Sequence, residues 1–288
     1  MILTCTAARR AKLSSILHTE LSMSTGLIKR LKYDHAFAVN GTPQRTNFIV
    51  EPGDTVTVRL DEAAPDYPAQ DAPLDILYED EALIAVDKPA GMMVHPSATR
   101  NDGTLANFLY GYYLRTGQKC AVHPVTRLDR DTLGVVLLAK NAHVHALLHQ
   151  MQLRGALDKT YRALVFGAPE TDSGVIDAPI VRPDPMRMRR DVGEGGLSAE
   201  TRYRVLRRGQ TSLLELRPIT GRTHQLRVHC LHSGFPIVGD PQYYTDGSRV
   251  WSDAHGFSTQ LLCAKELRLA HPITGAPLTL RSQYGAWE

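Results

Sequence analysis

The chain has 288 residues, of which 43% are hydrophobic, and its net charge of +3 sets 33 lysines and arginines against 30 acidic residues. This length can bury one large core with a smaller domain beside it. No stretch approaches the roughly 20 apolar residues that a transmembrane helix needs. The four cysteines are widely scattered without a Cys-x-x-Cys spacing, and they indicate neither a zinc ribbon nor a disulfide framework. We therefore expect a cytoplasmic protein with reduced thiols and no membrane association.

The first 60 residues have the pattern of a small domain with two helices and a few strands. Apolar residues at helical spacing predict one helix that begins at Leu13 and a second that begins after a cap at Ser24 or Thr25. An Asn-Gly turn at 40–41 separates two predicted strands, and "GDTVTVRL" alternates like a third strand.

This first segment is also locally basic. Over residues 1–50, basic residues outnumber acidic residues seven to two. Three of the basic residues lie on the second predicted helix: Lys29, Arg30 and Lys32. Two interpretations are open, because these side chains could bind the phosphates of RNA or form the solvated face of an ordinary surface helix.

The remaining chain predicts a second, larger domain. Residues 61–75 are rich in proline, aspartate and alanine without an apolar period, and they predict a linker. The domain over 76–288 includes a buried strand at 135–139, a helix over about 141–154, and a long arginine-rich connection at 182–196. Predicted strands outnumber helices without a regular βαβ alternation. We therefore expect an α+β fold with a mixed, largely antiparallel sheet.

The stretch "VTRLDRDTLGVVLLAK" places four charged residues directly before a predicted buried strand: Arg127, Asp129, Arg130 and Asp131. A charged turn with local ion pairs is the simpler interpretation. The alternative is a catalytic carboxylate that the strand holds rigidly while the side chain stays open to a cleft. The residue types alone do not decide between Asp129 and Asp131 for that role.

Three histidines near Cys230 raise the question of a zinc site: His224, His229 and His232. Only two residues separate His229 from His232, no His-Glu-x-x-His arrangement is present, and Arg227 within the cluster would repel a cation. We expect no metal. These histidines are better interpreted as supports of a pocket or as RNA contacts.

Five segments resemble, in order, the RluA/RluD-type pseudouridine synthases: "VDKPAGMMVHPS", "TRLDRDTLGVVLLAK", "KTYRALVFG", "SAETRYRVL" and "TGRTHQLRVHCLHSGFPIVGDPQYY". The resemblance covers about residues 76–285. It implies the pseudouridine synthase fold and the isomerisation of uridine in RNA, and the essential Asp of the family's Arg-Leu-Asp motif falls on Asp129. Residues 1–60 resemble the small ribosomal-protein-type RNA-binding domain often found at the front of RNA-modifying enzymes.

The resemblance implies roles for the side chains that would surround Asp129. Arg227 occupies the position of the family's partner arginine, which would keep the carboxylate ionised and fix its direction. Tyr161 would pack against the target base, and Arg127 would help to displace that base from the RNA stack.

Further residues match the family less directly. Arg222 is a second candidate for the partner arginine, and Arg222 and His224 are candidate RNA contacts. Asp240 and Lys88 fit the family pattern at positions where we expect a structural role. The sequence departs from the usual His, Ser and Lys of the family at three positions: Thr126, Leu133 and Leu197. These departures leave the identity of the RNA and the loop contacts open.

The isomerisation detaches the base, rotates it and rejoins it through a carbon, without a net change in atoms or electrons. We therefore expect no cofactor, and a carboxylate held close to the nucleoside. Ribosomal RNA is the expected partner, with transfer RNA as the alternative, and we expect a monomer. Two rivals stay open: an RNA-binding or ribosome-assembly factor that has kept the fold without turnover, and a hydrolase of the glycosidic bond, which would usually need two carboxylates.

Overall fold

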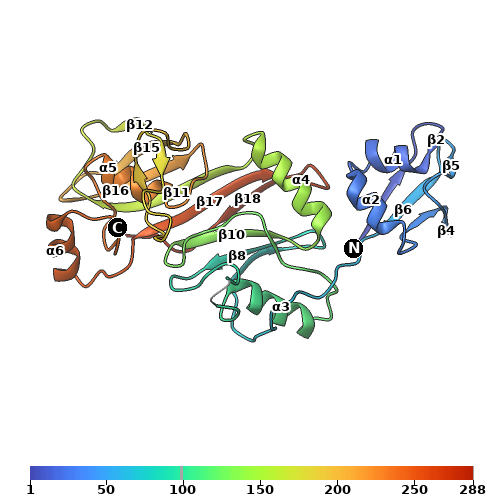
Figure 1. The fold of residues 1–288 in the computed structure, drawn as a ribbon, viewed down its shortest axis with the longest axis horizontal. Coiled ribbons are helices and arrows are strands. Elements are labelled where there is room, and N and C mark those ends of the chain that lie inside the picture. Colours follow the sequence, from blue (N-terminus) through green and yellow to red (C-terminus); the bar gives the residue numbers. More distant parts are fainter. Residues whose placement is uncertain (98–99, 288) are drawn as a thin grey trace.

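The computed structural model describes residues 1–97 and 100–287, and it contains two main β-sheets. The smaller sheet takes its strands from residues 2–59, and the larger sheet begins at residue 76. In Figure 1 the smaller unit lies at one end of an elongated molecule, and the larger sheet extends through the rest of it.

The N-terminal unit packs two short helices onto an antiparallel sheet with the strand order β1-β6-β3-β4. Both helices begin where the sequence predicts, and the Ser24 hydroxyl accepts a hydrogen bond from the backbone N–H of Leu27 at 3.2 Å to cap the second helix. The sequence did not predict β1, which pairs with β6. The elements are β1 (Ile2–Thr6), β2 (Ala11–Lys12), α1 (Leu13–Thr19), α2 (Thr25–Leu31), β3 (Phe37–Val39), β4 (Thr42–Pro43), β5 (Ile49–Val50) and β6 (Thr55–Arg59).

The larger unit is built on a ten-stranded sheet whose main path is β12-β15-β16-β11-β17-β10-β8-β7, with β18 paired to β17 and β9 to β10. Of the described pairings, β10 with β17 is parallel and the others are antiparallel, which agrees with the expected mixed α+β fold. The strands are β7 (Ile76–Glu79), β8 (Leu83–Lys88), β9 (His123–Pro124), β10 (Leu133–Ala139), β11 (Asp158–Phe166), β12 (Ser173–Asp177), β15 (Glu200–Arg207), β16 (Thr211–Pro218), β17 (Leu262–Ala270) and β18 (Pro277–Arg281). A separate hairpin joins β13 (Ile180–Val181) and β14 (Asp191–Val192). The helices are α3 (Leu105–Arg115), α4 (Ala142–Leu153), α5 (Gln225–His232) and α6 (Asp246–Ala254).

Both faces of the sheet are covered at β8 and β10, which explains the uninterrupted apolar run of β10. Alternate residues of a strand point to opposite faces. One face packs against α4 through a cluster that includes Leu83, Val135, Leu137, Val144 and Leu148. The other face packs against α3 through a cluster that includes Ile84, Val136, Leu138, Leu105 and Leu109. In Figure 1, α3 and α4 accordingly lie on opposite sides of these strands.

A glycine at the start of β10 allows the parallel pairing with β17. Gly134 has a φ of +110°, and a Cβ atom on it would lie 2.4 Å from the carbonyl oxygen of Ala264. Its register partner is that same Ala264. Because only glycine tolerates this conformation and this approach, Gly134 fixes the start of β10, and with it the loop before β10, against the centre of the sheet.

The segment 61–75 between the two sheets contains no helix or strand, but it is packed against the larger unit. Tyr67 is buried, and the backbone N–H of Gln70 donates to the carbonyl of Asn107 on α3. Gly111 is required here because a Cβ atom would lie 2.0 Å from the Gln70 carbonyl oxygen. Over the described residues, no helix is both long enough and apolar enough to span a membrane.

Candidate active site

Asp129 lies in the loop between β9 and β10, which local hydrogen bonds hold in shape. The Thr126 hydroxyl accepts a hydrogen bond from the backbone N–H of Leu137 at 2.9 Å, and the carbonyl of Asp129 accepts one from the N–H of Thr132 at 3.1 Å. The Asp129 side chain remains 29% exposed. The loop is therefore fixed from behind while its carboxylate stays open to an incoming molecule.

Arg227 on α5 connects this carboxylate to a second, buried carboxylate. Its Nη1 lies 3.0 Å from Oδ2 of Asp129, while its Nε and Nη2 lie 2.6 and 2.8 Å from the two carboxylate oxygens of Asp240. The Arg227 side chain is 6% exposed and that of Asp240 is fully buried. Burial alone would lower the pKa of Arg227, but Asp240 and Asp129 outweigh it and raise the pKa above its ordinary value. The guanidinium therefore stays charged and aims one donor at Asp129.

Asp240 in turn organises the loop that follows it. Its Oδ1 accepts hydrogen bonds from the backbone N–H groups of Gln242 and Tyr243, at 2.9 and 3.0 Å. The Tyr243 ring lies under the guanidinium of Arg227, with 4.9 Å from Cζ to the ring centroid. Asp240 therefore holds Arg227 in two ways, as expected of a structural residue. It pairs directly with the guanidinium, and it positions the Tyr243 ring that packs against it.

Tyr243 also links His224 to the arginine-rich hairpin loop between β13 and β14. Its hydroxyl accepts the backbone N–H of Arg190 at 2.7 Å and lies 2.9 Å from Nδ1 of His224. The Nε2 of His224 is 3.9 Å from Oδ2 of Asp129. Burial lowers the pKa of His224, so we assign a neutral ring that accepts the tyrosine proton at Nδ1 and carries its own proton on Nε2, toward Asp129.

Tyr161 on β11 lies within the electrostatic reach of the same carboxylate. Burial, with a further contribution from the charge of Asp129, raises its pKa well above the ordinary value, and the phenol stays protonated. The pairing of β11 with β17 shifts register between Thr160 and Tyr161. Such irregularities redirect a side chain out of the regular alternation, and they are frequent beside active sites.

Lys88 at the end of β8 fastens the Asp129 loop to the loop that follows β8. The side chain is fully buried, and its Nζ donates to the carbonyl oxygens of Pro89, Met92 and Arg130 at 2.9, 2.9 and 2.8 Å. Burial lowers its pKa to about 8, against the opposing charges of Asp131 and Asp129. With all three ammonium protons used by backbone carbonyls, Lys88 shapes the site.

The two aspartates of the charged cluster have different partners. Asp131 is buried and forms a fork with its neighbour Arg130, at 3.1 Å from Oδ1 to Nε and 3.0 Å from Oδ2 to Nη2. This pair fits the simpler interpretation of a charged turn with local ion pairs. Asp129 instead pairs with Arg227, which lies 98 positions away in the sequence.

The structure brings three of the candidate site residues into contact: Asp129, Arg227 and His224. Tyr161 lies near enough for the charge of Asp129 to raise the pKa of its phenol. Arg127 is exposed, and it has no hydrogen bond or ion pair to any residue among 1–97 and 100–287. Arg222 is exposed nearby, where its Nε donates to the Ser198 carbonyl at 3.0 Å. The three basic residues of the N-terminal unit are exposed on α2 and its C-cap: Lys29, Arg30 and Lys32.

The histidines do not form a metal site. His229 is fully buried, with Nδ1 2.9 Å from the Thr201 hydroxyl and Nε2 3.0 Å from the Ala178 carbonyl. Over the part of the chain that the structure describes, no three His, Cys, Asp or Glu side chains are grouped to hold a metal ion. His229 therefore serves as a structural link from α5 to the strands beside it.

Sequence reasoning did not identify Tyr243 or the backbone of Arg190 as parts of the site. A local signal for Tyr243 exists, because Asp240-Pro241 is a turn-forming pair whose carboxylate can accept N–H groups two and three residues later. No comparable signal marks Arg190, since its contact with Tyr243 forms only when the β13–β14 hairpin folds over α5.

Comparison with known families shows which family the chain belongs to. Residues 82–232 match the family described as RNA pseudouridylate synthase. The chain belongs to this family. The match includes the Asp129 loop, β11 and all of α5, whereas Asp240 and Tyr243 follow the matched region. The RluA/RluD-type motifs had predicted this membership, and it is confirmed.

Relatives of the RNA pseudouridine synthase family extend the likeness over most of the chain. The uncharacterized RNA pseudouridine synthase YhcT of Bacillus subtilis is 36% identical over 95% of this chain and 90% of its own length. The ribosomal large subunit pseudouridine synthase D of Pseudomonas aeruginosa is 37% identical, covering 86% of this chain and 80% of the relative. The solved structure of human RNA pseudouridylate synthase domain containing 1 has a TM-score of 0.60 at 25% identity, covering 75% of this chain and 86% of that chain. The chain is thus an RNA pseudouridine synthase with the fold that the sequence predicted.

Proposed function

We propose that this enzyme isomerises uridine to pseudouridine in ribosomal RNA, with Asp129 as the catalytic carboxylate. One observation carries the assignment of Asp129. Its carboxylate is 29% exposed, while Arg227, which holds it at 3.0 Å, is buried against Asp240. A carboxylate that is fixed from beneath and open above can meet a nucleoside without having to reorganise.

The reaction breaks the bond between N1 of the base and C1′ of the ribose, and it forms a bond between C5 and C1′. The proton that leaves C5 is balanced by the proton that N1 gains, so the step needs no oxidant or reductant. Asp129 can serve as a nucleophile at the base or at C1′, or as a base at the ribose. All these routes require the same ionised, oriented carboxylate, and Arg227 provides the orientation.

Two side chains beside Asp129 are proposed to handle the flipped base. Tyr161, redirected by the register shift in β11, would pack against its face. Arg127 is exposed and unpaired among the described residues, so its guanidinium is free to enter the RNA and replace the extruded base. We assign His224 to orienting Asp129, because its side chain is only 11% exposed. Arg222, which is exposed, remains a candidate RNA contact.

The choice of ribosomal RNA is supported by relatives named ribosomal large subunit pseudouridine synthase D, at 37 to 39% identity. These relatives are bacterial, which supports action in the cytoplasm. We further propose that residues 1–60 bind RNA and that the enzyme acts as a monomer. Exposed Lys29, Arg30 and Lys32 would face the RNA phosphates, which predicts binding that weakens steeply with salt.

The test is release of tritium from RNA that carries tritium at C5 of uridine, using wild type, Asp129→Asn and Asp131→Asn. We expect release by wild type and by Asp131→Asn, because the ion pair of Asp131 among the described residues is with its neighbour Arg130. Asp129→Asn should bind the same RNA and release nothing. If wild type releases tritium from transfer RNA but not from ribosomal RNA, transfer RNA is the substrate, and RNA binding without release from either would favour a binding factor. Free uracil as the product would indicate hydrolysis.

A further inference from the structure

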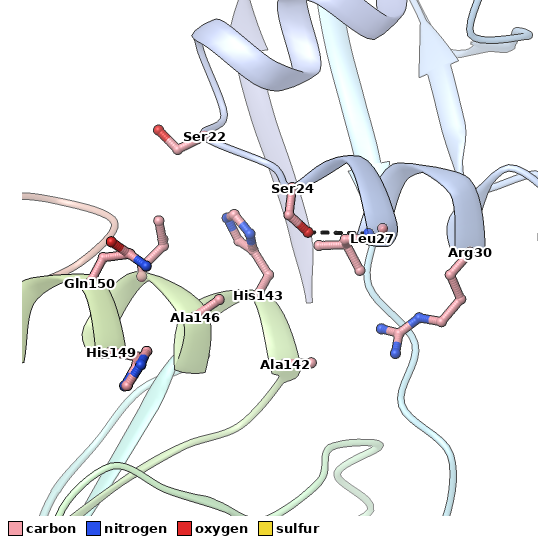
Figure 2. Close-up of a pocket in the computed structure, with 11 residues that line it drawn as sticks. Ser22, Ser24, Leu27, Arg30, Ala142, His143, Ala146, His149 and Gln150 are labelled. Atoms are coloured by element: carbon pink, nitrogen blue, oxygen red, sulfur yellow. Dashed lines mark hydrogen bonds between the residues drawn. The ribbon is translucent and has the colours of Figure 1, made fainter. Parts of the chain in front are cut away.

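A cleft separates the N-terminal unit from helix α4 of the larger unit. It has a volume of about 410 Å³, and its walls are α2 with the loop before it on one side and α4 on the other. Figure 2 shows His143 rising from α4 toward the gap between Ser22 and Ser24, and Arg30 directed from α2 toward the first turn of α4. None of the residues that line this cleft belongs to the Asp129 site described above.

The walls of this cleft are held together by Glu62, directly after the N-terminal sheet. Its Oε1 accepts the backbone N–H of Ala142 at 2.7 Å, and its Oε2 lies 3.5 Å from Nε2 of His123. Burial alone would raise the pKa of Glu62, but His123, the Ala142 amide and Arg30 together lower it. An ionised carboxylate therefore ties the chain after β6 to the start of α4.

The polar part of the cleft lining, which lies beside Leu27, Leu147 and two alanines, suits an anion. It contains Arg30, two histidines, two serines and a glutamine, and no Asp or Glu is among the lining residues. His143 is 3% exposed, yet its ring has no hydrogen bond to any residue among 1–97 and 100–287. Its ring nitrogens are not fully enclosed, so they stay accessible from the cleft. An unused imidazole that faces a cleft beside an arginine indicates a ligand with hydrogen-bonding oxygens and a negative charge.

We propose that this α2–α4 cleft binds the sugar-phosphate backbone of the RNA substrate, as a second contact remote from the target uridine. The inference rests on the proposed function and adds to it where the RNA lies. Phosphate oxygens match the arginine and the imidazole, and the serine and glutamine side chains can bond to phosphate or 2′-hydroxyl groups. Phosphate and sugar groups carry no base identity, so a contact with them is independent of sequence.

The distance between the two contacts sets a requirement on the RNA. Asp129 lies just before β10, and α4 begins just after β10. Seven residues of strand at about 3.3 Å each span roughly 20 Å. An RNA that occupies both places must extend along the sheet for at least this distance, so a short hairpin around the target uridine would miss the cleft.

Ala146 provides a direct test, because it is exposed, lines the cleft and lies on a helix that tolerates glutamate, glutamine and lysine. We would measure KM and kcat for Ala146→Glu, Ala146→Gln and Ala146→Lys on a large-subunit ribosomal RNA fragment and on the short hairpin cut from it. Leu153→Glu is the matched control, since Leu153 is 67% exposed at the other end of α4 and does not line the cleft.

On the long RNA, Ala146→Glu should raise KM about three- to tenfold, the effect of one opposing charge at contact distance. Ala146→Gln should leave KM close to wild type, and Ala146→Lys should lower it. The kcat of all variants, and every value on the hairpin, should stay at wild type, as should Leu153→Glu on both RNAs. An unchanged KM for Ala146→Glu on the long RNA, or an equal rise on both RNAs, would overturn the proposal.

Equilibrium binding of large-subunit ribosomal RNA separates this proposal from the proposed function. The slope of log affinity against log salt should become shallower by about 0.7 to 0.9 in Ala146→Glu for one lost phosphate contact, and it should not change in Leu153→Glu. This measurement needs no turnover. Absence of tritium release by wild type would therefore refute the proposed function, while identical salt slopes in all variants would refute the cleft.

Discussion

Replacing Arg227 with lysine tests how the site holds its carboxylate. Arg227 makes two short bonds to Asp240, at 2.6 and 2.8 Å, and one to Asp129 at 3.0 Å. Lysine keeps the charge but presents a single ammonium in place of the planar fork, so it cannot face both carboxylates in the same directions. Water cannot easily replace the lost bonds, because the Arg227 side chain is 6% exposed and that of Asp240 is fully buried.

The expected size of the effect follows from these contacts. Loss of one charge-assisted bond to Asp240 costs about 1.5–3 kcal/mol of stability, which lowers the melting temperature by about 3–12 °C. Loss of the bond to Asp129 frees the carboxylate to move by about 1 Å, which reduces kcat about 100-fold, equivalent to about 2.7 kcal/mol in the barrier. The affinity for RNA should not change, because Arg227 is buried beneath the site.

The assay is tritium release in a single turnover with enzyme in excess, with RNA binding and thermal melting measured on the same preparations. Arg222→Lys is the control, since Arg222 is exposed and contacts only the Ser198 carbonyl through its side chain among the described residues. Its saturated rate and its melting temperature should match wild type. If Arg227→Lys turns over at the wild-type rate with the wild-type melting temperature, Arg227 does not position Asp129, and the site must be assigned differently.

Three other predictions concern the surroundings of this pair. Tyr161→Phe should keep most of kcat/KM, whereas Tyr161→Leu should lose about five- to 150-fold, the value of stacking one base; equal losses in steady-state tritium release would exclude stacking. Tyr243→Phe removes the hydroxyl between Arg190 and His224. It should lower kcat about two- to tenfold and speed proteolysis in the loop 182–190, and wild-type behaviour in both assays would show that the hydroxyl is idle. Burial lowers the pKa of His229 in the folded protein. Below about pH 6.5 the His229 side chain of the unfolded chain therefore binds a proton that the folded chain does not. The stability that is present above that pH is lost as the pH falls. Melts between about pH 7.5 and 5.5 should show a flatter decline in His229→Gln, by up to about 1.4 kcal/mol per pH unit; parallel declines would contradict this.

Sequence patterns predicted elements whose cause is local or whose faces are uniformly buried. The apolar run of β10 was predicted at 135–139 and begins two residues earlier, and the cap left between Ser24 and Thr25 is Ser24. Helix α3 was not predicted, because its sequence "LANFLYGYYLR" is rich in aromatic residues and carries an internal glycine, which weakens helix propensity. A capping box at Thr104 and Asn107 and burial against the sheet stabilise it instead. Gly111 is there because the Gln70 carbonyl lies against the helix, a contact that only the folded chain reveals.

The candidate site shows the same limit. The family motifs nominated Asp129 and Arg227, but hydrophobic period and spacing could not have joined side chains that lie 98 positions apart. The sequence did not predict a role for Tyr243, because that role depends on contacts with three residues from separate segments: Arg190, His224 and Arg227. Residues whose role comes from tertiary contacts alone leave little trace in a single sequence.

The two aspartates of the charged cluster differ in where their counter-charges lie. Asp131 has its ion-pair partner on the adjacent residue Arg130, a pair that the local sequence alone can form, although the buried Lys88 also feels its charge. Asp129 has its counter-charge on another helix, and that arginine is itself held by a fully buried carboxylate. Burying such charges is costly unless each is paired. Here the pairing fixes the direction of the Asp129 carboxylate, which itself remains partly exposed. Stability alone does not call for that exposure, since replacing the triad by apolar side chains could be neutral or favourable. An oriented, accessible carboxylate is what the isomerisation requires, and this is the physical basis of our proposal that Asp129 carries the chemistry.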